Sequence, residues 1–279
     1  MLVEQRWEEI AEYLAGVRRR RPAVGEVVDL HERLLRAQHA AAQALPARAV
    51  DAESDRLAER NRQGLPVVAR GEFPIDLVAA TELFGGLLAA LRESGPEARD
   101  RAVAIQRGVE TGALDVVALL EGAVRGDEVG ECGGLDPEPL RLLAEASIRP
   151  GAEVLARGVG RFVEGDRWHR PTCPVCGSPP KIAELRGAEL AATRYLHCGF
   201  CAWAWAYRRS GCPFCENVDH RGLELLLIED DPRCKIETCQ HCRRYIKLVD
   251  NKEFFGLIPF LEELTTPHLD LLALERGYR

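Results

Sequence analysis

The first half of the chain carries apolar residues at the three- and four-residue spacing of helices that pack one face against a core. The clearest run is 76–92, where seven apolar residues share one face: Leu77, Ala80, Leu83, Phe84, Leu87, Leu88 and Leu91. The same spacing predicts helices over 4–19, 27–45, 95–112, 114–125 and 137–146. Prolines such as Pro22, Pro74 and Pro150 separate these runs, and proline ends or interrupts helices. The pattern predicts an all-helical domain over residues 1–165.

The pattern changes beyond Pro171. Segments become shorter, cysteines occur in pairs, and β-favouring runs at 223–228 and 245–249 lie between the pairs. We therefore expect an α+β protein with a domain boundary near residues 160–170. The predicted order is the helical domain at 1–165, a first tetracysteine ribbon at 166–208, and a second ribbon at 209–279 that ends in a helix.

Composition restricts where the chain works and what it binds. The first ten residues contain four charged side chains, and no run of about 18 uncharged apolar residues follows, so we expect no secretory signal, no membrane insertion and a cytoplasmic protein. The cytosol keeps thiols reduced, which makes disulfides an unsuitable role for the ten cysteines. A net charge of −7 opposes binding to a phosphate backbone, so nucleic acid is a secondary hypothesis.

Eight cysteines form four C-x-x-C pairs, which are the candidate metal ligands: Cys173, Cys176, Cys198, Cys201, Cys212, Cys215, Cys239 and Cys242. The first two pairs are separated by 21 residues and the last two by 23, while only 10 residues separate the second pair from the third. Spacings of this kind are typical of ribbon-type tetrathiolate sites. The simplest assignment is two consecutive four-cysteine sites. A cross-braced assignment, in which the first pair joins the third and the second joins the fourth, is the alternative.

Four thiolates close a tetrahedron and leave no position for water or substrate. Such sites stabilise structure, and the sequence also lacks the phosphate-binding glycine loop, the G-x-S-x-G motif and the H-E-x-x-H motif. We therefore expect a protein that is not an enzyme. Tetrahedral sulfur ligation suits zinc and also a rubredoxin-type iron.

Several residues near the pairs have two interpretations each. His197 and His241 adjoin cysteines, but four thiolates per site make them supporting or surface groups. Trp203, Trp205 and Tyr207 alternate along a predicted strand and form either ribbon packing or a docking surface. A set of basic residues could form a nucleic-acid patch or a solvated face: Arg208, Arg209, Arg243, Arg244 and Lys247. The stretch 64–74 is expected to be a loop that packs on the domain or meets a partner.

Four segments resemble the formate dehydrogenase accessory protein family, FdhE: CPVCGSPP at 173–180, RYLHCGFCAWAW at 194–205, RRSGCPFC at 208–215 and ETCQHCRRYIKLVD at 237–250. The specific motifs cover 173–250, and the helical first half agrees in length and character. The resemblance implies a cytoplasmic maturation factor, or chaperone, that binds the catalytic subunit of formate dehydrogenase. It also implies rubredoxin-like sites, which moves the expected metal toward iron, with zinc as the other candidate. No pattern in the sequence specifies an oligomeric state.

Overall fold

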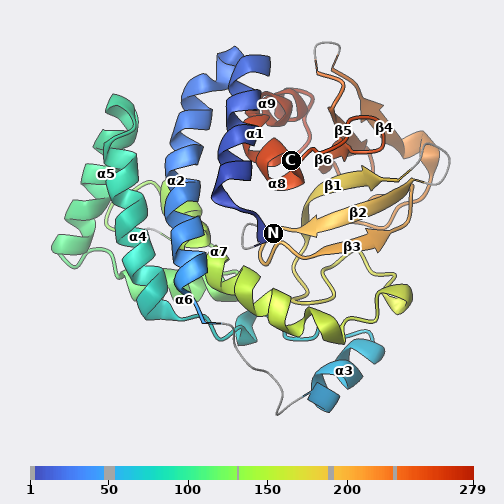
Figure 1. The fold of residues 1–279 in the computed structure, drawn as a ribbon, viewed down its shortest axis with the longest axis horizontal. Helices are drawn as coiled ribbons and strands as arrows, with labels where there is room; N and C mark the ends of the chain where they lie inside the picture. The colour runs from blue at the N-terminus through green and yellow to red at the C-terminus, as the bar shows by residue number, and fades with distance from the viewer. Residues whose placement is uncertain (1–3, 47–53, 131, 188–191, 229–230) are drawn as a thin grey trace. The chain divides into compact units, whose positions relative to one another are not determined.

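The computed structural model describes residues 4–46, 54–130, 132–187, 192–228 and 231–279. These residues form two compact units (Figure 1). The first unit contains the described residues up to 46 together with Val68–Val159. The second contains residues 54–67 together with Gly160–Arg279, so a short piece of the N-terminal half packs with the C-terminal half. The three-part division drawn from the sequence stays a prediction.

The described part of the first unit is helical: α1 (Trp7–Arg20), α2 (Gly25–Ala44), α4 (Leu77–Arg92), α5 (Gly95–Glu110), α6 (Val116–Arg125) and α7 (Pro137–Val159). Helix α4 begins where the Asp76 carboxylate accepts hydrogen bonds from the N–H groups of Val78 and Ala79, at 3.0 Å each. Five of the seven residues of its predicted apolar face are buried, Leu77 and Leu91 are partly buried, and α4 contacts α2, α5, α6 and α7. This unit confirms the predicted helical first half.

Helix α7 is longer than the sequence predicts, because it continues through Pro150. Proline lacks an N–H group, so the carbonyl of Ala146, four residues earlier, loses its helical partner. The side chain of Gln38 from α2, which is 4% exposed, donates a 2.8 Å hydrogen bond to that carbonyl. The expected break at Pro150 is therefore wrong, since a buried amide from a neighbouring helix replaces the missing bond.

The second unit contains one six-stranded sheet with the order β3-β2-β1-β6-β5-β4. Its strands are β1 (Pro180–Arg186), β2 (Thr193–Cys198), β3 (Ala204–Tyr207), β4 (Leu223–Leu226), β5 (Cys234–Cys239) and β6 (Tyr245–Asp250). Strands β1–β3 form one antiparallel module and β4–β6 form another. The two modules join through a parallel pairing of β1 with β6, in which Ile182 lies opposite Lys247. The predicted α+β class is confirmed.

Short helices accompany the sheet. Helix α8 (Pro259–Thr265) contacts β1 and β6, and α9 (Pro267–Glu275) contacts β5 (Figure 1). The ammonium group of Lys247 in β6 is buried between these elements, 2.7 Å from the Asp270 carboxylate. Helix α3 (Ser54–Arg62) also belongs to this unit. None of the helices in the described ranges is both long and apolar enough to cross a bilayer.

Candidate metal centres

All four C-x-x-C pairs adopt the same tight turn. In each, the N–H of the first cysteine donates a 2.9 Å hydrogen bond to the carbonyl five residues later. The residue that follows the second cysteine has a positive φ in every turn: Gly177 (79°), Ala202 (57°), Glu216 (60°) and Arg243 (59°). Backbone N–H groups then point at sulfur, as where Phe200 and Cys201 donate to the Cys198 Sγ at 3.3 and 3.4 Å. Only the first turn uses glycine, the residue suited to this conformation.

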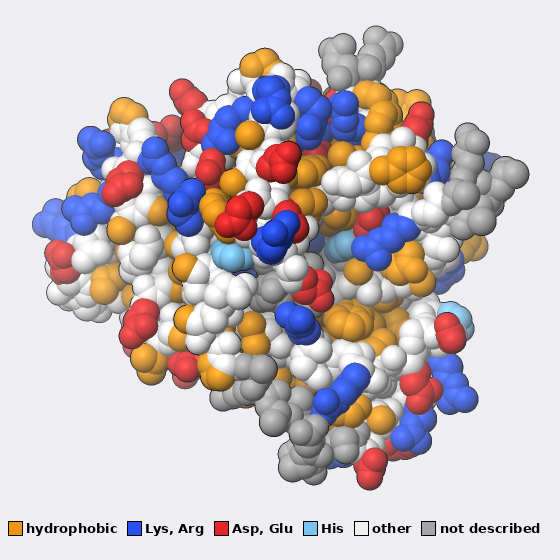
Figure 2. Space-filling model, viewed as in Figure 1, with side chains coloured by type: hydrophobic (Ala, Val, Ile, Leu, Met, Phe, Trp, Pro, Cys, Tyr) orange, Lys and Arg blue, Asp and Glu red, His pale blue; other side chains and the backbone are white. Residues whose placement is uncertain are grey.

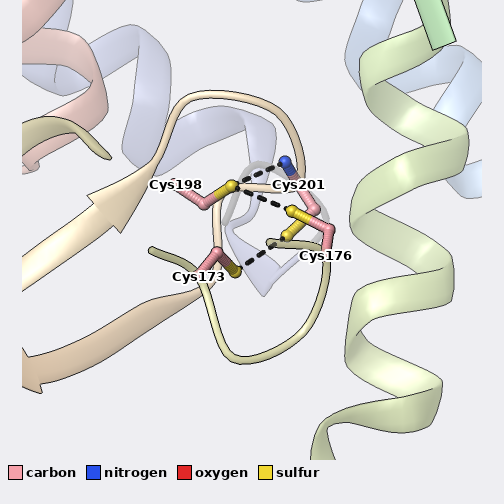
Figure 3. Close-up of side chains that lie close together, drawn as sticks. All are labelled: Cys173, Cys176, Cys198 and Cys201. Carbon is pink, nitrogen blue, oxygen red and sulfur yellow. Dashed lines mark hydrogen bonds between the residues drawn. The ribbon is translucent and has the colours of Figure 1, made fainter. Parts of the chain in front are cut away.

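The turns bring the eight predicted cysteines together as two groups of four, each within 4.8 Å between sulfurs. Cys173, Cys176, Cys198 and Cys201 make the first cluster, and their side chains converge from two loops (Figure 3). Cys212, Cys215, Cys239 and Cys242 make the second. Consecutive pairs therefore share a site, which is the simpler of the two arrangements considered, and the cross-braced arrangement is not found.

The sulfur spacing fits a tetrahedral metal ion. Bonds of about 2.3 Å from a central ion place neighbouring sulfurs about 3.8 Å apart. In the first cluster the Cys173–Cys201 and Cys176–Cys198 sulfur pairs are 3.7 and 3.3 Å apart. In the second the Cys212–Cys242 and Cys215–Cys239 pairs are 3.6 and 3.7 Å apart. Both clusters thus have the donor set and the dimensions to hold one ion each.

The electrostatics of the first cluster also call for a cation. Burial raises the pKa of the Cys173 and Cys201 thiols well above their usual range. Burial also opposes ionisation of Cys176, but hydrogen bonds from the neighbouring cysteines hold its pKa well below the usual range. Four thiolates in one buried space repel one another and lose solvation, so a bound cation is the condition under which all four ionise together.

The two clusters differ in exposure. All four cysteines of the first are buried, whereas Cys215 and Cys242 of the second are partly exposed. Burial nevertheless raises the pKa of Cys212 and of Cys242 as well. We therefore treat the first cluster as enclosed and the second as accessible from solvent.

A segment distant in sequence supports the first cluster. The carbonyl of Pro174, inside the first turn, accepts hydrogen bonds from the Val67 N–H at 2.9 Å and from the Asn61 side chain at 3.3 Å. The Asn61 amide oxygen in turn accepts from the Glu164 N–H at 2.9 Å, and Asn61 is 4% exposed. The first residues of the predicted loop 64–74 thus pack against the metal turn. Sequence reasoning missed Asn61, because nothing in its neighbourhood marks a metal site.

Substitution of Asn61 by alanine is expected to lower the stability of the second unit by about 1–3 kcal/mol, since it leaves buried polar groups unpaired. It should also speed metal loss from the first cluster by about tenfold or more, as loss of supporting hydrogen bonds does at other metal sites. Metal release to a chromogenic chelator measures this rate. Gln63→Ala, which removes an exposed amide two residues away, is the control. Equal release rates in the two variants would contradict the supporting role.

The remaining candidates near the cysteines lie outside both clusters. His197 bonds through Nε2 to the buried Glu184 carboxylate at 2.7 Å, and His241 is exposed on the fourth turn. Cys234 is buried, and its thiol lies 3.2 Å from the Glu262 carboxylate. None of the three belongs to a four-cysteine group.

The aromatic residues at and before strand β3 pack within the second unit and do not form an open docking surface. Trp205 and Tyr207 are buried, and the Trp205 indole N–H donates to the Arg170 carbonyl at 3.2 Å. The Trp203 ring presses on Gly160, where an added Cβ would lie 2.2 Å from ring carbon Cζ3. Glycine is required there because no side chain fits beneath the indole.

Replacing Gly160 with alanine is expected to lower the free energy of unfolding of the second unit by about 1–3 kcal/mol through overpacking. Thermal unfolding followed by tryptophan fluorescence measures the loss. Gly165→Ala is the matched control, since no atom lies within 4 Å of the Cβ that it adds. The double variant Gly160→Ala with Trp203→Leu should recover part of the stability. An additive double variant would show that the close approach does not matter.

The five basic residues considered as a nucleic-acid patch do not form one exposed basic surface. Lys247 is buried, Arg208 pairs with Glu216 at 3.1 Å, and Arg243 donates to the carbonyls of Arg276 and Gly277. Arg209 and Arg244 form no ion pair within the described ranges, and Arg209 donates to the Ala192 carbonyl. Figure 2 shows basic and acidic side chains interspersed over the face it displays. The arrangement of these residues does not favour nucleic-acid binding.

Comparison with known proteins agrees with the resemblance drawn from the motifs. The family profile described as FdhE, central domain, matches residues 172–209, which include the first cluster. A protein FdhE homolog of Aquifex aeolicus is 27% identical over 232 residues, covering 82% of this chain and 77% of the relative. A protein FdhE homolog of Serratia proteamaculans is 27% identical over 226 residues, covering 80% and 71%.

The fold has a solved counterpart. The crystal structure of the FdhE protein from Pseudomonas aeruginosa aligns with a TM-score of 0.70 at 23% identity, covering 98% of this chain and 92% of that one. The order of a helical region followed by a sheet region is thus an established fold.

Proposed function

Because this chain belongs to the FdhE family, we propose that it is a maturation factor for formate dehydrogenase. In this proposal it binds the catalytic subunit in the cytoplasm and is needed for assembly of active enzyme. The observation that carries the proposal is the pair of four-cysteine clusters, which coincide with the motifs of the resemblance. The protein acts as a binding factor and not as an enzyme.

The geometry of the clusters supports a non-enzymatic role. Four sulfurs around each ion complete a tetrahedral shell, so neither substrate nor water can reach an open coordination position. A bound ion would fix the turns and, if it is iron, could also change oxidation state. The clusters are therefore proposed to hold the sheet in shape or to sense redox conditions.

Two metal ions per chain are proposed, with rubredoxin-type iron favoured by the resemblance and zinc compatible with the same sulfur donors. Metal analysis by mass spectrometry on protein purified without added metal identifies the ion. About two iron atoms with thiolate-to-iron visible absorption support redox sensing. About two zinc atoms and no colour restrict the clusters to a structural role.

The maturation role is tested in a host from which the gene for this protein has been deleted. We expect formate dehydrogenase activity to be lost and then restored by the intact chain but not by Cys173→Ala. The intact chain should also co-purify with the catalytic subunit. Full enzyme activity without this protein, together with absence of co-purification, would overturn the proposal.

A further inference from the structure

A cavity of about 230 Å³ opens beside the second cysteine cluster, within the second unit. Its apolar lining comes from neighbouring strands: Leu185, Leu223, Leu225, Ile246 and Leu248. Cys212 and Cys239 also line it, so an occupant would lie against the cluster. Sites for whole small-molecule ligands are typically about 300–1,000 Å³. This cavity is smaller and suits one large apolar side chain.

The cavity lies along the outer strand of the sheet. Strand β4 pairs with β5, and no other described strand lies on its far side. The Gln240 N–H donates to the Gly222 carbonyl, so these two residues form a hydrogen-bonded pair. In an antiparallel ladder such pairs alternate with pairs whose backbone N–H and C=O groups point away from the partner strand. By that alternation the backbone groups of Leu223 and Leu225 point outward, away from β5. They are available to an added strand, and Leu225 itself is 49% exposed.

Two cations border the same cavity. Arg209 and Arg244 line it, and within the described ranges neither forms an ion pair. The Arg244 guanidinium instead lies 3.8 Å from the centroid of the Phe214 ring, which fixes its place at the cavity. Two carboxylates, Glu224 and Glu237, also line the cavity. Glu237 pairs with the buried Arg194, and Glu224 accepts a hydrogen bond from the Gln240 side chain. The rim therefore offers two arginines to an incoming carboxylate.

From these features we propose that β4 and its cavity bind an extended, acidic segment of the formate dehydrogenase catalytic subunit. The segment adds a strand to β4, inserts one apolar side chain into the cavity and places a carboxylate on Arg209 and Arg244. Strand addition supplies backbone hydrogen bonds, and the cavity supplies selectivity. This inference rests on the proposed function and names the surface by which the protein binds the catalytic subunit.

Binding of the purified catalytic subunit, and of overlapping peptides that cover its sequence, to the full chain tests the site. Leu225→Glu introduces a charge at the cavity and repels an acidic segment, so we expect its dissociation constant to rise by about tenfold or more. Leu271→Glu is the matched control, because Leu271 is a 60% exposed leucine of α9 outside the cavity. Arg209→Gln with Arg244→Gln should weaken binding and reduce its dependence on salt. Metal content verifies that each variant is folded.

The outcomes separate the two proposals. If the intact chain binds the subunit and Leu225→Glu binds it equally well, the cavity is not the site, while the maturation role stands. If the intact chain binds neither the subunit nor any peptide, the proposed function fails and the site assignment fails with it. If Leu225→Glu abolishes only self-association in sedimentation, β4 is an interface between copies, which overturns the assignment. A tenfold loss confined to the cavity variants supports it.

Discussion

Replacement of Cys173 by alanine is expected to reduce the metal content from two ions per chain to one and to unfold the first module, β1–β3. Binding of a structural ion by four thiolates contributes about 10 kcal/mol or more to folding, which exceeds the stability of a small module. Because β1 pairs with β6, the second module should also lose protection along that strand. The first unit has its own core and should stay folded.

Metal analysis, hydrogen exchange and limited proteolysis measure these effects. Cys132→Ala is the control, since Cys132 lies in the first unit and outside both clusters. It should keep two ions and the exchange pattern of the unaltered chain. A Cys173→Ala protein that also retained two ions would show that the first cluster is not a four-thiolate site.

The second large effect is a difference in metal lability between the clusters. A chelator should remove one ion at least about tenfold faster than the other, and the faster ion should be that of the second cluster. The physical reason is exposure, because solvent reaches Cys215 and Cys242 but none of the cysteines in the first cluster. Oxidants should follow the same order.

Time courses with a chromogenic chelator separate the two phases. The fast phase should disappear in Cys212→Ala, and the slow phase should disappear in Cys173→Ala, each variant serving as the control for the other. A single phase in the unaltered chain, or the opposite assignment, would contradict the difference in exposure.

The sequence predicted the parts of this protein that local rules control. The run 76–92 has one apolar face and an aspartate cap, and α4 forms there with only small differences at its ends. The cysteine pairs were recognisable as ligands because two residues within each pair and about twenty between pairs match the geometry of a ribbon-type metal site. The spacing also made two consecutive sites the simpler grouping, but it left the cross-braced grouping open until the fold was known.

The rest depends on contacts between distant residues. Pro150 predicts the end of a helix, but α7 continues, and the Gln38 side chain, 112 positions earlier, supplies a bond to the carbonyl that the proline leaves without its helical partner. Asn61 is an ordinary polar residue of a short helix until the fold places it beside Pro174. Similarly, Lys247 looks like a surface cation until α9 brings Asp270 over it. No local pattern records these pairings, since each is created by tertiary packing.

The parallel joint between the modules is head-to-tail. Each module has a first, a second and a third strand, and the joint places the first strand of one, β1, against the third strand of the other, β6. The outer strands of the sheet are then β3, a third strand, and β4, a first strand. The two edge strands, β3 and β4, thus hold the same positions in their modules as β6 and β1, which pair at the centre of the sheet. A tandem duplication could append another three-stranded module by reusing this joint, whereas a two-fold arrangement, which pairs like with like, would close after two.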